Sequence, residues 1–404
     1  MTLNVSERSS TISYAIRDVV EYARKLESKG DNILKLNIGD PLKFDFKTPE
    51  PMVDAIINAA RGNFNGYEDS LGNTELRRVI AERESKNNGK IYLEDVVITS
   101  GVTEGVNLVF GATLEPGDEV LIPGPGYPTY TAYATFFGAT PIPYRTIEED
   151  NWNIDVQDLK SKITDRTKCI VIINPNNPTG ATYSKKNLKE ILDIAIEHDL
   201  FIISDEIYDR ITFNDSFLSP ASMTDEVPIM TFNGISKIYL APGWRVGYIA
   251  FYNWDTLFDI KEGIMKELRA RIAANSICQV GAIEAYKSSE KYVLEMVSKL
   301  KERSEFAYKR LNEIPGISTS KPMGGLYIFP KVELENRWKD DKEFVYEFLK
   351  MKKVLLVHGS GFCPTYGKGH FRSVFLPPID IMEEAFSRLE RSEEHTSELQ
   401  SLAY

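Results

Sequence analysis

The segment from Thr231 to Tyr248 reads TFNGISKIYLAPGWRVGY. It places a serine hydroxyl directly before Lys237 and the guanidinium of Arg245 eight residues after it. A lysine amine that is held neutral forms a Schiff base with an aldehyde, while Ser236 and Arg245 suit a phosphate. An ordinary surface lysine near an arginine is the alternative when Lys237 is considered alone. The segment therefore predicts a site for a ligand that carries both an aldehyde and a phosphate.

Short runs rich in β-branched residues alternate with helical patterns on either side of this segment. In the helical interval Asn187–His198, for example, apolar residues recur at helical spacing. Such alternation favours an α/β fold, in which helices cover both faces of a largely parallel sheet. We therefore predict a mostly parallel, seven-stranded sheet. The predicted strands are Val96–Thr99, Glu119–Ile122, Thr140–Tyr144, Ile170–Asn174, Phe201–Asp205, Ile229–Asn233 and Val246–Ala250.

The pattern changes after about residue 285. Helical patterns over 288–311 and 342–352, with short strands near 325–329, 354–358 and 372, indicate a smaller α+β domain. We predict an N-terminal arm over 1–47 that packs with the small domain, a large domain over 48–285 and the small domain over 286–390. The remainder, 391–404, begins RSEEHTSELQS and matches translated sequencing-adapter DNA. We set it apart as an artefact tail, with a natural polar tail as the alternative.

The composition limits the classes of partner. The chain of 404 residues has a net charge of -11, with acidic and basic residues mixed, which disfavours nucleic acid and anionic membranes. Its start is polar, and no apolar run approaches the ~18 residues of a membrane span. Three distant cysteines suit a reducing compartment, so we expect a cytoplasmic protein. The four histidines lack metal-ligand spacing and no GxGxxG follows a strand, so we expect neither a metal nor a dinucleotide.

Two glycine-containing segments follow predicted strands. Gly101, Val102 and Thr103 begin a helix, whose free N–H groups suit a phosphate, although such turns also occur without a ligand. Tyr127 lies in PGPGYPTY (123–130), a rigid loop at a strand end, where open α/β sheets bind ligands. Its ring can stack on a planar ligand. A packed tyrosine in a tight turn is the alternative.

Two further strand ends carry polar side chains. Asn177 in NPNNPTG (174–180) can donate to a phenolate oxygen, or can hold an Asx turn. Asp205 in SDEIY (204–208) puts a carboxylate at the end of a buried strand, and Tyr208 follows three residues later. An anion against a pyridine nitrogen keeps that nitrogen protonated, whereas a helix N-cap is the alternative for Asp205. Together with the aldehyde and the phosphate, these groups indicate pyridoxal 5'-phosphate (PLP) as the ligand.

Arg372 lies inside the apolar run HFRSVF (370–375). A buried guanidinium without a partner costs free energy. A substrate carboxylate bound bidentately is one natural partner, and an internal salt bridge is the alternative.

These strings, in this order and spacing, resemble the class I aminotransferases of fold type I, which depend on PLP. The resemblance runs from about Tyr14 to Glu390 and rests on NPNNPTG, SDEIY and SK…GWRVGY. Four further strings are most similar to the archaeal and bacterial alanine aminotransferase branch: LNIGDP (36–41), YRTIEE (144–149), VHGSGF (357–362) and HFRSVFLPP (370–378). The fold type implies a large sheet domain and a smaller α+β domain.

The resemblance implies a role for each matching residue. As catalytic residues, Lys237 would bond to the cofactor and shuttle a proton, Asp205 would pair with the pyridinium, and Tyr208 would contact the phenolic oxygen. The substrate-binding residues would be Gly39, Asn177, Arg372, Tyr14 and Arg17. A packing tyrosine and a surface arginine are the alternatives for the last two. The cofactor-binding residues would be Gly101, Val102, Thr103, Tyr127, Asn177, Asp205, Tyr208, Ser236, Lys237, Arg245 and, from the neighbouring subunit of a homodimer, Tyr67.

The implied reaction converts L-alanine and 2-oxoglutarate to pyruvate and L-glutamate by a ping-pong scheme, so the implied small-molecule partners are amino acids and 2-oxo acids. No arginine dedicated to the distal carboxylate of glutamate is identifiable, so aspartate or an aromatic amino acid is an alternative donor. A PLP-dependent C–S β-lyase is a second alternative and a non-catalytic PLP-binding regulator a third. The full set of Lys237, Asp205 and Arg372 argues against the third.

Overall fold

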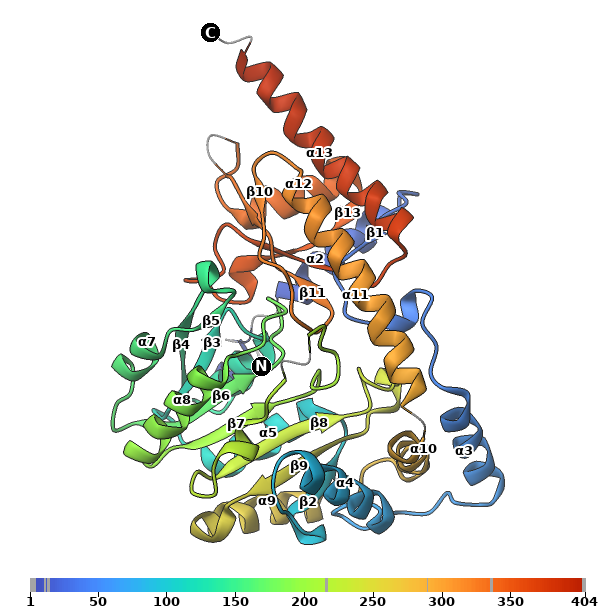
Figure 1. The fold of residues 1–404 in the computed structure, drawn as a ribbon, viewed down its shortest axis with the longest axis vertical. Helices are drawn as coiled ribbons and strands as arrows, with labels where there is room; N and C mark the ends of the chain where they lie inside the picture. Colours follow the sequence, from blue (N-terminus) through green and yellow to red (C-terminus); the bar gives the residue numbers. More distant parts are fainter. Residues whose placement is uncertain are drawn as a thin grey trace, which may run out of the picture.

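The computed structural model of the chain describes residues 5–10, 12, 15–214, 217–288, 290–334 and 337–401, without the side chains of 7, 15, 256 and 392–401. Tyr14 and the end of the predicted tail, 402–404, lie outside the described residues. Figure 1 shows a broad sheet with its helices in the lower part of the molecule and a smaller group of helices and strands above it. Helix α13 (Ile379–Ser401) continues through the backbone of most of the predicted tail.

The large sheet contains eight strands in the order β2-β9-β8-β7-β6-β3-β4-β5. β9 is antiparallel to both neighbours and β5 is antiparallel to β4, whereas the other pairs are parallel. The mostly parallel α/β fold is confirmed, with one strand more than the seven predicted. The strands are β2 (Val96–Thr99), β3 (Glu119–Gly124), β4 (Thr140–Ile147), β5 (Asn153–Ile154), β6 (Thr167–Ile173), β7 (Phe201–Asp205), β8 (Ile229–Gly234) and β9 (Gly247–Tyr252).

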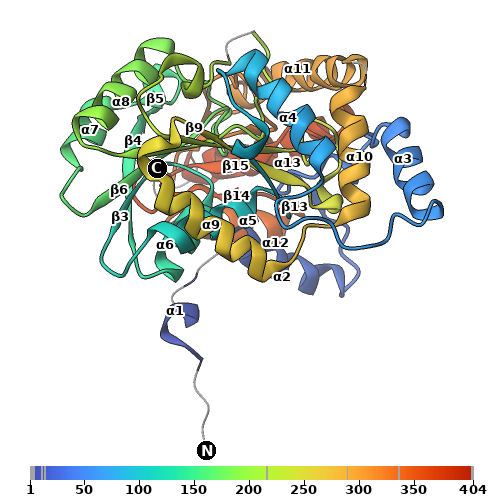
Figure 2. The ribbon, with the colours of Figure 1, turned by 90° about the horizontal axis from the view of Figure 1, so that it is seen from below.

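Both faces of this sheet are buried under helices, as Figure 2 shows from below. In β6, Ile170 and Ile172 belong to one apolar core and Val171 and Ile173 to a second, because successive side chains of a strand point to opposite faces. The first core includes residues of α4, α7, α8 and α10, and the second those of α5, α6 and α9. The helices of this part of the chain are α3 (Glu50–Arg61), α4 (Thr74–Asn87), α5 (Val102–Thr113), α6 (Pro128–Phe136), α7 (Val156–Ser161), α8 (Lys185–Glu197), α9 (Phe258–Arg271) and α10 (Ser276–Lys287).

The smaller group of elements consists of short strands and long helices. The strand β15 (Phe371–Val374) lies between β11 (Tyr327–Ile328) and β14 (Val357–His358). Helix α2 (Ala15–Glu27) contacts α12, β13 and β14, and β1 (Leu34–Lys35) pairs with β13. The start of the chain thus packs with its C-terminal part. The remaining elements are α1 (Glu7–Ser10), α11 (Lys291–Asn312), α12 (Asp341–Lys352), β10 (Ile317–Ser318), β12 (Lys331–Val332) and β13 (Val354–Leu355).

We keep the domain limits 47/48, 285/286 and 390/391 as proposals; the second falls within the last turn of α10. Among the described residues, no helix is both long and apolar enough to cross a lipid bilayer.

The carboxyl ends of the central parallel strands lie next to the smaller group of elements. β6 ends at Ile173, and the loop that follows it contacts the segment before β11, where Gly180 O accepts hydrogen bonds from Met323 N and Gly324 N. β7 ends at Asp205 and β8 at Gly234. The loops that carry the predicted site residues therefore meet at the boundary between the two parts of the chain.

Candidate active site

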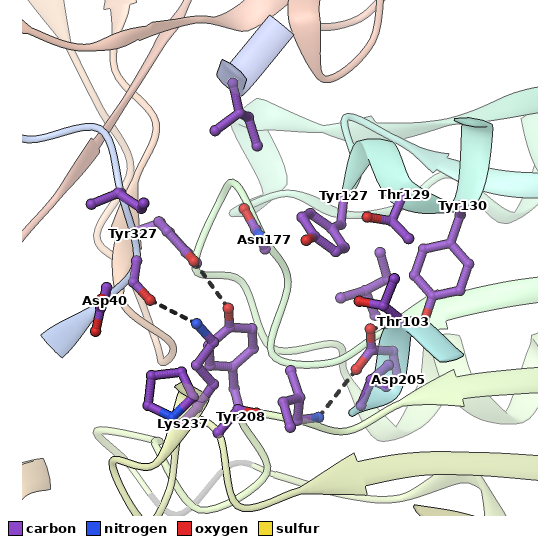
Figure 3. Close-up of a pocket in the computed structure, with 18 of the residues that line it drawn as sticks. Asp40, Thr103, Tyr127, Thr129, Tyr130, Asn177, Asp205, Tyr208, Lys237 and Tyr327 are labelled. Atoms are coloured by element: carbon purple, nitrogen blue, oxygen red, sulfur yellow. Dashed lines mark hydrogen bonds between the residues drawn. The ribbon is translucent and has the colours of Figure 1, made fainter. Parts of the chain in front are cut away.

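A cavity of about 540 Å³ lies at these strand ends, and residues of both parts of the chain line it. Figure 3 shows its labelled side chains arranged around one open space, with Lys237 and Tyr327 opposite Tyr127 and Tyr130. The structure brings most of the predicted residues together here. Those that line the cavity are Arg17, Gly39, Val102, Thr103, Tyr127, Asn177, Asp205, Tyr208, Ser236, Lys237, Arg245 and Arg372.

Lys237 stands in the turn after β8. Its Nζ donates a hydrogen bond of 2.6 Å to the carbonyl oxygen of Gly39, which comes from the segment after β1. This bond holds the amine on one side of the cavity. An amine with a fixed position, facing an open space, is what covalent catalysis by lysine requires.

Asp205 ends β7 and is 3% exposed. Its Oδ2 accepts a hydrogen bond of 2.8 Å from the hydroxyl of Tyr130, and its Oδ1 accepts one from the backbone N–H of Ile207. Burial raises the pKa of this carboxyl from 3.8 to about 6, and the hydrogen bonds from Tyr130 and Ile207 oppose that rise. The site thus holds a buried carboxyl group whose ionised form would be stabilised by a cationic ligand.

Tyr208 and Asn177 lie on the side of the cavity next to the small sheet, which consists of β11, β15 and β14. The Tyr208 hydroxyl is 3.0 Å from that of Tyr327. Asn177 Oδ1 accepts a hydrogen bond of 3.0 Å from Nη1 of Arg372. The amide N–H₂ group of Asn177 is a donor, so a hydroxyl and an amide donor face the same space.

Arg372 reaches the cavity from β15 and is 2% exposed. Its Nη2 also donates to the carbonyl oxygen of Asn37. The guanidinium lies 4.4 Å from the centroid of the Tyr327 ring and 4.8 Å from that of Phe362. Two rings and two hydrogen-bond acceptors therefore fix the plane of the guanidinium, which suits bidentate binding of a carboxylate.

The N-terminus of α5 forms a separate corner of the cavity. Gly101 precedes the helix with φ 81° and ψ 167°, a conformation that is essentially restricted to glycine. A Cβ at this position would lie 2.3 Å from Nη2 of Arg245. That guanidinium also donates to Ser100 O at 3.2 Å and to Pro242 O at 3.0 Å. A cation therefore lies against the free N–H groups of a helix, an arrangement that suits a phosphate.

Among the described residues, the predicted Gly101 and Tyr67 do not line this cavity; Gly101 directly precedes Val102, which does. Tyr67 is 89% exposed and does not line it. Tyr14 lies outside the described residues. Arg17, from the first turns of α2, lines the cavity together with Ile16 and Val20.

Sequence reasoning assigned no role to Tyr130 and Tyr327, or to Asp40 and Thr129, which also line the cavity. Tyr130 was visible as the last residue of PGPGYPTY, and Asp40 as part of LNIGDP. The contact between Tyr327 and Tyr208 spans 119 positions of the chain, and no spacing rule connects the two.

Comparison with known proteins agrees with this geometry. A profile of the family described as aminotransferase class I and II matches residues 31–389. The chain is 38% identical to the alanine aminotransferase of Mycobacterium tuberculosis strain H37Rv, over 95% of this chain and 91% of the relative. It is also 38% identical to the glutamate-pyruvate aminotransferase of Escherichia coli K12, over 96% of both chains.

A solved structure of an aminotransferase also matches the chain. The alanine aminotransferase of Pyrococcus furiosus superimposes with a TM-score of 0.95 and 52% identity, over 97% of this chain and 100% of that one. The chain therefore belongs to the class I and II aminotransferase family and is a PLP-dependent transaminase.

Proposed function

We propose that this protein is an alanine aminotransferase, which converts L-alanine and 2-oxoglutarate to pyruvate and L-glutamate in two half-reactions at one site. The observation that carries the proposal is the meeting of Lys237, the buried carboxyl of Asp205 and the buried guanidinium of Arg372 at one cavity. The similarity to the alanine and glutamate-pyruvate aminotransferases of Mycobacterium, Escherichia and Pyrococcus supports alanine and glutamate as the amino donors.

The chemistry of the cavity fits PLP. When bound, this cofactor supplies an aldehyde that bonds to amines and a ring that takes up the electron pair left at the substrate Cα. Asp205 is suited to hold the protonated ring nitrogen, because it is a buried carboxyl group whose ionised form a cationic nitrogen would stabilise. Tyr208 and Asn177 are suited to the phenolic oxygen, and Tyr127 to the ring face. The residues suited to the phosphate are Gly101, Val102, Thr103, Ser236 and Arg245.

Lys237 is the residue that we assign to proton transfer. Nζ of Lys237 takes the Cα proton of the amino acid and delivers it to the carbon on the other side of the amino nitrogen. Its hydrogen bond to Gly39 O keeps the amine next to the backbone that we assign to substrate binding. Water must be kept away during this transfer, and closure of the small sheet and α2 over the cavity would exclude it.

The substrate groups are assigned to residues from several parts of the chain. Arg372 and Asn177 hold the α-carboxylate, helped by the backbone N–H of Gly39. Arg17 and Tyr14 contact the side chain of the substrate, and Arg17 supplies a positive charge for the distal carboxylate of glutamate and 2-oxoglutarate. The position of Arg17 beside the cavity supports this assignment.

We also propose a homodimer in which Tyr67 of each subunit contacts the cofactor phosphate of the other. The segment from α3 to Tyr67 exposes three large apolar side chains, since Ile57 is 41%, Phe64 45% and Tyr67 89% exposed. Exposed apolar side chains that are close in the chain are typical of an interface. Tyr67 does not line the cavity of its own chain. In the proposed homodimer, it would contact the phosphate in the cavity of the partner subunit.

The half-reaction with L-alanine alone tests the function. Purified protein loaded with PLP is mixed with L-alanine, the visible absorption of the cofactor is recorded and pyruvate is assayed. We expect loss of the visible band with about one pyruvate per active site, because the first half-reaction consumes one amino acid for each cofactor. Addition of 2-oxoglutarate should restore the band. Keto acid formed only from aspartate or aromatic amino acids, or release of ammonia, would contradict the proposal.

Replacement of Lys237 tests the assignment of proton transfer, and replacement of an exposed lysine is the matched control. Lys237→Ala should lower pyruvate formation by about 10³-fold, the usual contribution of a general acid–base group, and the protein should still bind PLP non-covalently. Lys186→Ala removes a lysine of α8 whose side chain is 85% exposed, and should leave the rate unchanged. Near-normal turnover by the Lys237 variant would contradict the assignment.

A further inference from the structure

Tyr327 lies where the large and small sheets meet. It stands on β11, next to the strand that carries Arg372, whereas Tyr208 follows β7 of the large sheet. The two tyrosine hydroxyls are 3.0 Å apart and both side chains are 3% exposed. Figure 3 marks this contact beside the cavity. It connects a residue assigned to the cofactor with the element assigned to the substrate.

The hydroxyl of Tyr327 has room because residue 39 is glycine. A Cβ at Gly39 would lie 2.0 Å from Oη of Tyr327, closer than unbonded atoms approach. The carbonyl of the same glycine accepts the hydrogen bond from Lys237. Gly39 therefore places the Tyr327 hydroxyl and the lysine amine on the same side of the cavity.

The number of protons decides the direction of the contact between the two hydroxyls. A tyrosine hydroxyl has one proton to donate. Burial raises the pKa of Tyr208 well above its ordinary value, so Tyr208 keeps its proton. Under the proposed function, Tyr208 gives this proton to a hydrogen bond with the phenolic oxygen of PLP. Tyr327 must then be the donor to Tyr208.

This direction has a consequence for the cofactor. A hydroxyl that accepts a hydrogen bond becomes a stronger donor, because hydrogen bonds in a chain polarise one another. The bond from Tyr327 therefore strengthens the bond from Tyr208 to the phenolic oxygen. A stronger bond to that oxygen favours its negatively charged form.

The ring of Tyr327 makes a second, independent contact. The guanidinium of Arg372 lies over this ring at 4.4 Å from the centroid. A cation over an aromatic face is attracted by the ring quadrupole. The hydroxyl and the ring of one side chain thus contact the groups that we assign to the cofactor and to the substrate carboxylate.

We propose that Tyr327 is a positioning residue with two separable actions: its hydroxyl strengthens the hydrogen bond of Tyr208 to the cofactor, and its ring holds Arg372 in place for the substrate carboxylate. The inference rests on the proposed roles of Tyr208 and Arg372. It predicts that loss of the hydroxyl alters kcat and the pH midpoint of the cofactor absorption, whereas loss of the ring also alters KM.

The test compares Tyr327→Phe with Tyr327→Leu in the PLP-loaded enzyme. In Tyr327→Phe, the pH midpoint of the visible cofactor absorption should rise by about 0.2 to 0.7 pH unit, because the charged phenolic oxygen loses support. We expect kcat for L-alanine to fall about 3- to 10-fold, with KM within about twofold of wild type. Tyr327→Leu should show the same change in the midpoint and, in addition, a rise in KM of about 5-fold or more.

Three further variants separate this inference from the function on which it rests. Tyr208→Phe should raise the midpoint more than Tyr327→Phe does, and the double variant should match Tyr208→Phe. Tyr144→Phe is the matched control, because it removes another buried tyrosine hydroxyl, bonded to Val171 O at 2.7 Å, that does not line the cavity. The other charged or titratable groups that line the cavity are kept: Arg17, Asp40, Tyr127, Tyr130, Asp205, Lys237, Arg245 and Arg372.

The outcomes are distinct. A shift in Tyr208→Phe with none in Tyr327→Phe overturns the inference and leaves the proposed function standing. No shift in Tyr208→Phe overturns the role of Tyr208 itself. Equal KM values for the Phe and Leu variants overturn the role of the ring. A shift of the same size in Tyr144→Phe would assign the effect to general loss of packing and overturn the inference as well.

Discussion

At the residue scale, Asp205 couples the cavity to the stability of the protein. Its pKa, raised by burial from 3.8 to about 6, means that the folded chain holds this proton more tightly than the unfolded chain does. The free energy of unfolding should therefore fall as the pH rises from about 4 to about 6, by roughly 3 kcal/mol from this group, and then stay level. A cationic ring nitrogen beside the carboxylate would offset the free-energy cost of ionising Asp205, so binding of such a ligand should stabilise the folded protein.

Asp205→Asn tests this in protein from which the cofactor has been removed. The amide cannot ionise, so the variant should gain up to roughly 3 kcal/mol relative to wild type between pH 4 and pH 7.5. Urea unfolding at the two pH values measures the difference. Asp54→Asn, on the exposed side of α3, is the control. Its free energy of unfolding should differ from that of wild type by the same amount at both pH values. An equal effect of Asp205→Asn at both pH values would refute the shifted titration.

The sequence predicted the residues at strand ends well but not their partners. Asp205 ends β7 as expected, since a charged residue after a buried apolar run marks the end of a strand. Its partner Tyr130 lies 75 positions away on α6, and only the packing of that helix against the sheet brings the two together. Contacts between side chains of distant elements depend on tertiary structure, so local patterns do not contain them.

At the element scale, the N-terminus of α5 concentrates features that suit a phosphate. Gly101→Ala puts a side chain into a glycine-only conformation and against Arg245, at a cost of order 1–3 kcal/mol for the backbone alone. We expect the Kd for PLP to rise at least about tenfold, since part of this cost falls on the bound state. Equilibrium titration of the cofactor-free protein measures it.

Gly105→Ala on the same helix is the control for this prediction. A Cβ at Gly105 would meet Ile249 at 3.4 Å, an ordinary contact distance, and alanine is the better helix former. This variant should bind PLP as wild type does. Equal losses of affinity in both variants would indicate general disturbance of α5 rather than a local phosphate site.

Helix α2 offers a test of substrate selection. Arg17→Met keeps the length of the side chain and removes its charge, so the KM values for 2-oxoglutarate and L-glutamate should rise about 10- to 100-fold, as for loss of a charge-assisted hydrogen bond. The KM values for L-alanine and pyruvate should change less than about threefold, because these substrates have no distal carboxylate. Arg24→Met, an exposed position on the same helix that does not line the cavity, should change none of the four. A uniform rise for all four substrates would contradict the assignment of Arg17.

Among the elements, the predicted strands of the large sheet match the observed ones to within a few residues, because all of them except β4 are runs buried on both faces. The unpredicted strand is β5, whose two residues Asn153 and Ile154 pair antiparallel with the end of β4. A strand of this length shows no periodicity in the sequence. Without β5, β4 would be the edge strand of the sheet, and an edge strand can accept a neighbour that has no apolar signal of its own.

At the scale of the whole molecule, the cavity combines parts of the chain that are far apart in sequence. Gly39 and Arg17 come from the N-terminal arm, and Arg372 from β15. Asp205 ends a strand of the large sheet, and Asn177 and Lys237 lie in loops that follow its strands. Movement of the small sheet and α2 relative to the large sheet would therefore change the distance between substrate-binding and cofactor-binding groups. The same architecture leaves Tyr67 outside the cavity of its own chain.

The proposed homodimer predicts that Tyr67 acts in the site of the neighbouring subunit. The protein should sediment with twice the chain mass of 45.8 kDa. Tyr67→Phe should keep this mass and weaken PLP binding about tenfold, the usual effect of losing one hydrogen bond to a charged group. Sedimentation and cofactor titration measure the two properties, and the exposed Tyr92→Phe, 54% exposed, is the control.

Mixed dimers decide between action within one chain and action across the interface. In a dimer of one Lys237→Ala chain and one Tyr67→Phe chain, exchange of Tyr67 across the interface gives one site with both changes and one site with neither. Such dimers should therefore show, at limiting PLP, about half the activity of wild type, with wild-type affinity for the cofactor, since one of two independent sites is intact. If Tyr67 instead served its own chain, every active site in the mixed dimer would lack the hydroxyl. The affinity would then equal that of Tyr67→Phe alone, and the shared site would be excluded.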